Sequence, residues 1–153
     1  MLTEEIKNAI QESVLCWLAT TDENGCPNVS PKEMFLAHED TKLLIANIAS
    51  PESVSNIRVN PNVCVSMIHV FKQKGFKLKG RARIVERNDT GYQLLEDKLY
   101  TLGGKDFEIK SIFEITLTEA KPIIAPSYWL FPNTTESSQI EQSMKTYGVF
   151  KST

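Results

Sequence analysis

Two kinds of hydrophobic spacing alternate along this chain of 153 residues. Just after Thr3, apolar residues recur at helical spacing, and this predicts a short helix capped by Thr3. Dense runs rich in valine, isoleucine and phenylalanine follow, separated by turn residues, which is typical of strands joined as hairpins. We expect strands over 14–21, 28–36, 42–48, 63–71, 76–86 and 112–124.

Helix signals lie between these strands. Ser50 followed by Pro51 predicts a helix start with Ser50 as its cap, and Asn60-Pro61 predicts its end. Asp89 or Thr90 is the expected cap of a second helix, which ends at Gly103-Gly104 and turns Leu95, Leu99 and Leu102 inward. A further helix is expected over 136–147.

Six strands with short helices between them predict a mainly β fold, a six-stranded antiparallel barrel whose openings the helices cover. The length suits a single domain over 1–153. We expect the tail, 126–153, to pack on the barrel or on a partner subunit.

Composition excludes several classes of function. Seventeen basic and 19 acidic residues give a net charge of -2, so no global field recruits nucleic acid or an anionic membrane. The first residues contain no long apolar run, and we expect a cytoplasmic protein without a membrane span. Cys16, Cys26 and Cys64 form no C-x-x-C pair and His38 and His69 form no cluster, so we expect no disulfide framework and no metal site.

Two polar segments are candidates for binding a nucleotide. At 47–53, two serine hydroxyls and the free N–H groups of a helix start suit a phosphate, although an ordinary capped helix explains the pattern equally well. At 28–34, Pro31 removes a ladder donor, so backbone groups are free to bind a planar ring while Lys32 adds positive charge. The alternative there is a solvated edge strand with a Lys-Glu pair.

Basic and aromatic residues form two further candidates. Lys77, Lys79, Arg81 and Arg83 alternate with apolar residues, so one face of their strand is basic. Acids of a partner subunit or a bound phosphate would relieve the repulsion among them, and a solvated outer face is the alternative. In the tail, the aromatic run 128–131 suits either stacking on a cofactor or packing in a core or dimer interface.

Short motifs in a fixed order extend over about 14–84. They are LATT at 18–21, DENGCP at 22–27, SPKEM at 30–34, NIAS at 47–50, NI at 56–57 before NP at 60–61, and KLKGRA at 77–82. Together they resemble the pyridoxamine 5'-phosphate oxidase-like family of FMN-binding split barrels. The resemblance implies a homodimer with two FMN molecules at the subunit interface, each phosphate held mainly by one chain and each ring partly covered by the other.

The same resemblance assigns residues to the cofactor. Lys32, Glu33 and Met34 would line the ring and ribityl region, and the serines of 47–53 the phosphate end. Lys77 would approach from the adjacent strand or the other subunit, and Trp129 from the tail. The full set is Ser30, Lys32, Glu33, Met34, Asn47, Ile48, Ser50, Ser53, Asn56, Lys77 and Trp129.

The chain also departs from the oxidase. Ala37, Glu52 and Ser53 stand where the oxidase has basic residues, and the segment 145–153 contains no arginine, whereas the oxidase ends in an arginine-containing substrate motif. We therefore do not expect pyridoxamine phosphate oxidation. The leading hypothesis is a flavin-dependent oxidoreductase, in which FMN carries the redox chemistry and no catalytic acid, base or nucleophile is required.

Other functions remain open at this point. The barrel could hold FMN or another anionic planar ligand as a carrier without turnover, or it could be an empty structural dimer. A deazaflavin or haem could replace FMN.

Overall fold

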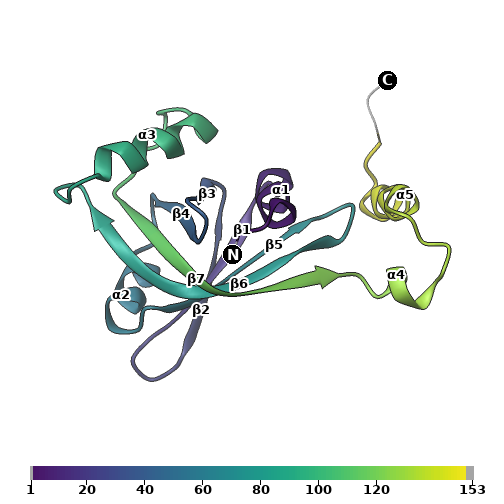
Figure 1. The fold of residues 1–153 in the computed structure, drawn as a ribbon, viewed down its shortest axis with the longest axis horizontal. Helices are drawn as coiled ribbons and strands as arrows, with labels where there is room; N and C mark the ends of the chain where they lie inside the picture. The colour runs from purple at the N-terminus through teal and green to yellow at the C-terminus, as the bar shows by residue number, and fades with distance from the viewer. Residues whose placement is uncertain (1, 151–153) are drawn as a thin grey trace.

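The computed structural model describes residues 2–150, and more of them lie in strands than in helices (Figure 1). The strands are β1 (Cys16–Thr21), β2 (Pro27–Lys32), β3 (Phe35–His38), β4 (Lys42–Asn47), β5 (Asn62–His69), β6 (Lys74–Glu86) and β7 (Ser111–Ile124). The helices are α1 (Glu4–Glu12), α2 (Pro51–Val59), α3 (Tyr92–Gly103), α4 (Ser127–Leu130) and α5 (Glu136–Tyr147). The predicted mainly β class with short flanking helices is confirmed.

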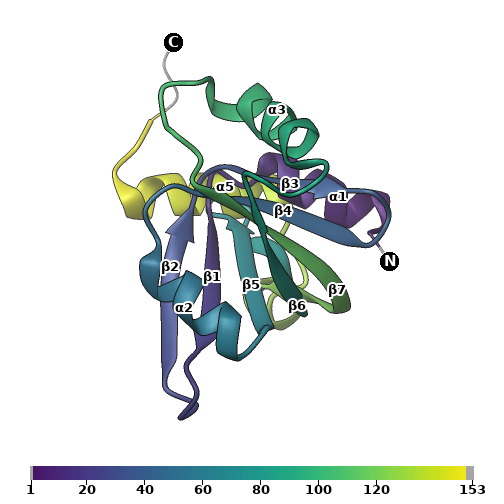
Figure 2. The same ribbon diagram turned by 90° about the vertical axis from the view of Figure 1, so that its left-hand side faces the viewer.

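The strands form one sheet in the order β2-β1-β5-β6-β7-β4-β3, and each neighbouring pair is antiparallel. The sheet coils strongly, because the long strands β6 and β7 bend across it (Figure 2). Its two ends, β2 and β3, are edge strands, so the barrel is split between them.

The sheet has seven strands instead of the predicted six, because the stretch 28–36 is two strands. The chain bends at Glu33 and Met34, so that β2 pairs with β1 while β3 pairs with β4 at the opposite end of the sheet. The bend therefore lies where the barrel is split.

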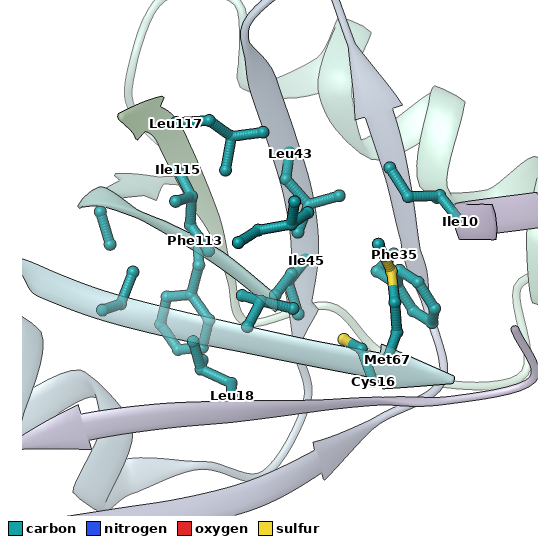
Figure 3. Close-up of a cluster of buried hydrophobic side chains, with 14 of the residues drawn as sticks. Ile10, Cys16, Leu18, Phe35, Leu43, Ile45, Met67, Phe113, Ile115 and Leu117 are labelled. Atoms are coloured by element: carbon teal, nitrogen blue, oxygen red, sulfur yellow. The ribbon is translucent and has the colours of Figure 1, made fainter. Parts of the chain in front are cut away.

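The main core lies inside the coiled sheet (Figure 3). Leu18, Met67 and Phe113 are almost completely buried there, and Ile6 and Ile10 of α1 close one side. Thr3 caps α1 as predicted, since its hydroxyl accepts a hydrogen bond from the N–H of Ile6.

A second core cluster lies between α3 and the sheet. Leu95 and Leu99 are buried as predicted, but Leu102 is half exposed, because α3 ends one residue later and the chain turns away at Gly104. The predicted cap is also wrong: α3 starts after Gly91, and the carboxylate of Asp89 instead accepts from the N–H of Glu86.

The segment that carries α4 and α5 extends to the far end of the molecule (Figure 1). It touches the turn between β5 and β6: the Tyr128 hydroxyl donates to the carbonyl of Lys72 at 2.8 Å, and Lys74 pairs with Glu136 at 2.9 Å. None of the helices within residues 2–150 is long and apolar enough to cross a membrane.

Gly80 lies at a β-bulge in the pairing of β6 with β7. A Cβ atom there would overlap the carbonyl oxygen of Thr116 and lie 2.8 Å from Cγ2 of Ile115. Overpacking of this kind costs roughly 1–3 kcal/mol. We expect Gly80→Ala to lower the free energy of unfolding by that amount in urea titrations, whereas the exposed control Thr116→Ala should change it by less than about 1 kcal/mol. Equal stability of both variants would show that the strands can separate at the bulge without cost.

Candidate functional site

The side chain of Lys32 is the central feature of the site. It points from the end of β2 toward the start of α2 and is only 7% exposed. Its ammonium donates to the hydroxyls of Ser30 at 2.6 Å and Ser50 at 2.7 Å, and to the carbonyl of Pro31 at 3.3 Å. Within residues 2–150, no carboxylate lies within ion-pair distance of it. The protein groups within residues 2–150 that accept hydrogen bonds from this buried ammonium are thus two hydroxyls and one carbonyl.

Burial lowers the pKa of Lys32 below its ordinary value, because a desolvated ammonium is less stable than the neutral amine. Cys16, the cross-strand neighbour of Lys32, is completely buried, and desolvation raises the pKa of its thiol to about 12. The thiol is therefore protonated at neutral pH and gives the ammonium no counter-charge. A bound anion would supply this counter-charge.

The N-terminal end of α2 lies beside the Lys32 ammonium. Pro51 occupies the first helical position, and Ser50 precedes it as predicted. Within the described chain, however, the Ser50 hydroxyl makes no capping bond, because it instead accepts from Lys32. The N–H groups of the first turn are left for another acceptor, and they add the positive end of the helix dipole to the charge of Lys32.

A network of hydrogen-bonded polar side chains lies behind Lys32 and holds its partner Ser30. Ser30 lies 3.3 Å from the hydroxyl of Ser53, which also accepts from the amide of Asn28 at 3.4 Å. The hydroxyl of Thr20 accepts from Asn28 and, at 3.1 Å, from the amide of Asn56. Asn56 and Thr20 are 5% and 2% exposed, so this network fixes α2 against β1 and β2.

Asn47 fixes the other side of the corner. Its side-chain NH2 group donates to the hydroxyl of Ser111 at 2.8 Å, and its side-chain oxygen Oδ1 accepts from the backbone N–H of Ser50 at 3.2 Å. Asn47 and Ser111 are both buried. Asn47 thus holds the backbone of Ser50 in place beside Lys32.

A cavity of about 510 Å³ opens next to this cation. This size is within the range of small-molecule and cofactor sites, roughly 300–1,000 Å³. Its polar lining comes from Lys32, Glu33 and Ser50, and the rest is mainly apolar: Pro31, Met34, Ala46, Ile48, Ala49, Leu102, Gly103 and Phe107. The cavity can therefore hold a largely apolar molecule with one anionic end.

The structure brings most of the predicted site residues together. Lys32, Glu33, Met34, Ile48 and Ser50 line the cavity. The predicted Ser30, Ser53, Asn47 and Asn56 lie behind them in the polar network.

Two predicted residues lie elsewhere in the same chain. Lys77 is on the outer face of β6, three strands away from β2 in the sheet. Trp129 is on α4, is 70% exposed, and bonds only locally to the carbonyl of Ala125. Within one chain, neither is part of this cavity.

Sequence reasoning missed several contributors. Leu102 and Gly103 reach the cavity from the end of α3, and Phe107 from the segment that follows it; no local pattern indicates this, because all three lie far along the chain from Lys32 and Ser50. Thr20 and Ser111 were also missed. Thr20 is visible in the sequence as a polar residue at an inward-facing position of an apolar strand.

Comparisons with known proteins identify proteins that are similar to this chain. The Vibrio cholerae heme oxygenase HutZ is 35% identical over 94 residues, which are 57% of this chain and 52% of HutZ. The chain thus spans about half the length of the curated relative it matches.

Solved structures share the fold. HupZ of Group A Streptococcus superposes with a TM-score of 0.68 at 20% identity, covering 78% of this chain and 92% of that one. An FMN-binding protein of Syntrophomonas wolfei gives a TM-score of 0.69 at 13% identity, covering 81% of this chain and 87% of that one.

The family model for pyridoxamine 5'-phosphate oxidase matches residues 2–123. That range contains the corner at 47–53, the buried lysine and the whole cavity lining, and it confirms the resemblance seen in the sequence. The chain therefore belongs to the pyridoxamine 5'-phosphate oxidase family of split barrels.

Proposed function

We propose that this protein binds FMN and is a flavin-dependent oxidoreductase. The observation that carries the proposal is the buried ammonium of Lys32, which has hydroxyl partners but no carboxylate partner in residues 2–150. A phosphate would supply the missing negative charge, and the apolar walls of the adjacent cavity suit a planar ring. Bound FMN would supply hydride or electron transfer, so the protein needs only to bind and orient it.

The residues of the cavity divide the binding task. Lys32 and the hydroxyl of Ser50 would hold the phosphate, together with the N–H groups of the first turn of α2. Met34 and Ile48 would pack against the ring. Ser30, Ser53, Asn47 and Asn56 lie behind the residues that line the cavity, and their contacts support a positioning role.

The outer face of the sheet supports a homodimer. Trp17 and Val29 are 47% and 55% exposed there, and Ile68 lies on the neighbouring strand β5. A groove of about 420 Å³ runs beside Trp17 and Ile68, and its lining is mostly apolar. Exposed apolar patches of this kind mark interaction sites, and the occupant that we propose is a second copy of this chain.

Haem is the second candidate ligand, because HutZ is described as a heme oxygenase. Among the residues of the described chain that line the cavity, none is a histidine, cysteine or tyrosine, and Met34 is the one side chain of a type that ligates haem iron. A haemin titration of the wild-type protein and Met34→Leu decides this point. A Soret band that shifts in the wild type and not in the variant would favour haem over FMN.

Replacing Lys32 tests the phosphate site. The wild-type protein, loaded with FMN and freed of excess by gel filtration, should elute at dimer size with about one FMN per chain. Lys32→Met should bind FMN at least about tenfold more weakly and therefore retain less of it, since a charge-assisted contact to phosphate is worth about 1.5–3 kcal/mol. The control Lys7→Met changes a lysine on α1 that pairs with Glu4, and it should load like wild type. Equal loading of Lys32→Met, with unchanged thermal stability, would contradict the proposal.

The pKa of Lys32 predicts how FMN affinity depends on pH. Because burial lowers this pKa, the amine of the free protein loses its proton at a lower pH than an ordinary lysine, and the neutral amine attracts phosphate less. FMN affinity should therefore fall as pH rises through the lowered pKa. Quenching of flavin fluorescence measures this across the pH range below the ordinary lysine pKa of about 10.4. Lys32→Arg should bind FMN with a flat profile, and the same slope in that variant would assign the titration to another group.

Turnover separates an enzyme from a carrier. If the protein is an oxidoreductase, the FMN-loaded dimer should oxidise NADH or NADPH faster than free FMN does at the same concentration, because the bound ring is oriented toward its donor. Stopped-flow absorbance of the flavin band follows the reduction. Rates equal to those of free FMN with both nucleotides and with several acceptors would favour the carrier.

A further inference from the structure

One wall of the cavity exposes apolar side chains to water. Residues 104–110 form the loop that joins α3 to β7, and Phe107 lies in the middle of this loop (Figure 2). Phe107 lines the cavity together with Leu102 of the last turn of α3. Phe107 is 59% exposed and Leu102 is about half exposed. A ligand in the cavity would cover this apolar surface, which is favourable because it removes the surface from water.

The centre of the loop is held by few interactions. Residues 105–107 are all exposed, and within the described part of the chain they form no hydrogen bond and no ion pair. The ammonium of Lys105 lies over the ring of Tyr100, 5.7 Å from its centre, which is a weak cation-π contact at an exposed site. Segments with few buried contacts are those that move most readily in a folded protein.

Both ends of the same segment are fixed. Gly104 has a φ of 69° and a ψ of −173°, a conformation essentially restricted to glycine, and its N–H donates to the carbonyl of Tyr100 at 3.0 Å. At the other end, Arg87 donates to the carboxylate of Glu108 at 2.7 Å and to the carbonyl of Ile109 at 2.9 Å. Residues 104–108 are therefore a strap with two fixed ends and a free centre.

The strap begins and ends beside residues of the proposed FMN site. Before the strap, Gly103 lies against Met34, since a Cβ atom at Gly103 would be 3.5 Å from the sulfur of Met34. After the strap, the N–H of Lys110 donates to the backbone carbonyl of Asn47 at 2.9 Å. The side chain of Asn47 in turn accepts from the N–H of Ser50. A ligand bound at this corner therefore lies within reach of the centre of the strap.

We infer that Phe107 is a ligand-binding residue, and that the strap closes it over the ligand in the cavity. The inference rests on the proposed function, in which this ligand is FMN with its phosphate at Lys32. A planar ring offers the phenyl group a face or an edge to pack on, and the contact removes apolar surface of both from water. Lys32 then holds the anionic end of the ligand by charge, and Phe107 covers its apolar part.

Removal of the phenyl group tests this cover. We expect Phe107→Ala to bind FMN about tenfold more weakly than wild type, measured by quenching of flavin fluorescence. The loss should lie mainly in faster dissociation, followed by stopped flow, because the strap closes after FMN has entered. The control Phe131→Ala removes a phenylalanine that is 63% exposed and lies outside this cavity, and it should bind like wild type. Both variants should keep the thermal stability of the wild type, because both side chains are largely exposed.

Alkylation of a thiol on the strap tests the closure itself. In Phe107→Cys, saturating FMN should slow the reaction of the thiol at position 107 with iodoacetamide several-fold, as read at that residue by mass spectrometry. The matched control is Leu94→Cys, because Leu94 is exposed on α3 and does not line the cavity. FMN should leave its alkylation rate unchanged. Equal rates at position 107 with and without FMN would overturn the inference.

Failure of the inference and failure of the proposed function give different results. If the wild-type protein binds no FMN, the proposed function is wrong and the inference falls with it. If the wild type binds FMN and Lys32→Met binds it weakly, the anion site is supported. Unchanged affinity and an unchanged dissociation rate of Phe107→Ala would then show that Phe107 does not cover the ligand, and the inference alone would be wrong.

Discussion

The site depends on the cost of burying the ammonium of Lys32. A buried positive charge is unfavourable unless it is paired, and within residues 2–150 the hydrogen-bond partners of this one are hydroxyl and carbonyl groups. Other features follow from this. The Ser50 hydroxyl accepts a hydrogen bond from the ammonium and makes no capping bond to α2. The serine and asparagine side chains between β1, β2 and α2 hold the partners of the ammonium in place. An anion bound beside the ammonium would offset the cost of its burial.

The fold determines where this charge can lie. Because the chain bends at Glu33 and Met34, β2 and β3 end up at opposite edges of one sheet, and the barrel is open between them. The bend carries Lys32 into that opening, where the start of α2 and the end of α3 meet it.

Local patterns were sufficient to predict most of the elements and part of the site. Helical spacing and turn residues gave α1, α5 and the hairpins, and the motif order gave the corner around Ser50 and the segment around Lys32. Properties that depend on distant contacts could not be read in the same way. The break between β2 and β3 follows from pairing with strands on opposite edges, and Phe107 reaches the cavity from a segment with no motif.

The protonation state of Lys32 is the most direct test of this account. Lysine side-chain resonances can be followed by NMR through a pH titration, with Lys32→Arg used to assign the Lys32 signal. The account predicts that the pKa of Lys32 lies below its ordinary value in the free protein and rises when FMN binds, because the phosphate stabilises the ammonium. A pKa of Lys32 that is the same with and without bound FMN would show that the buried ammonium does not hold the phosphate.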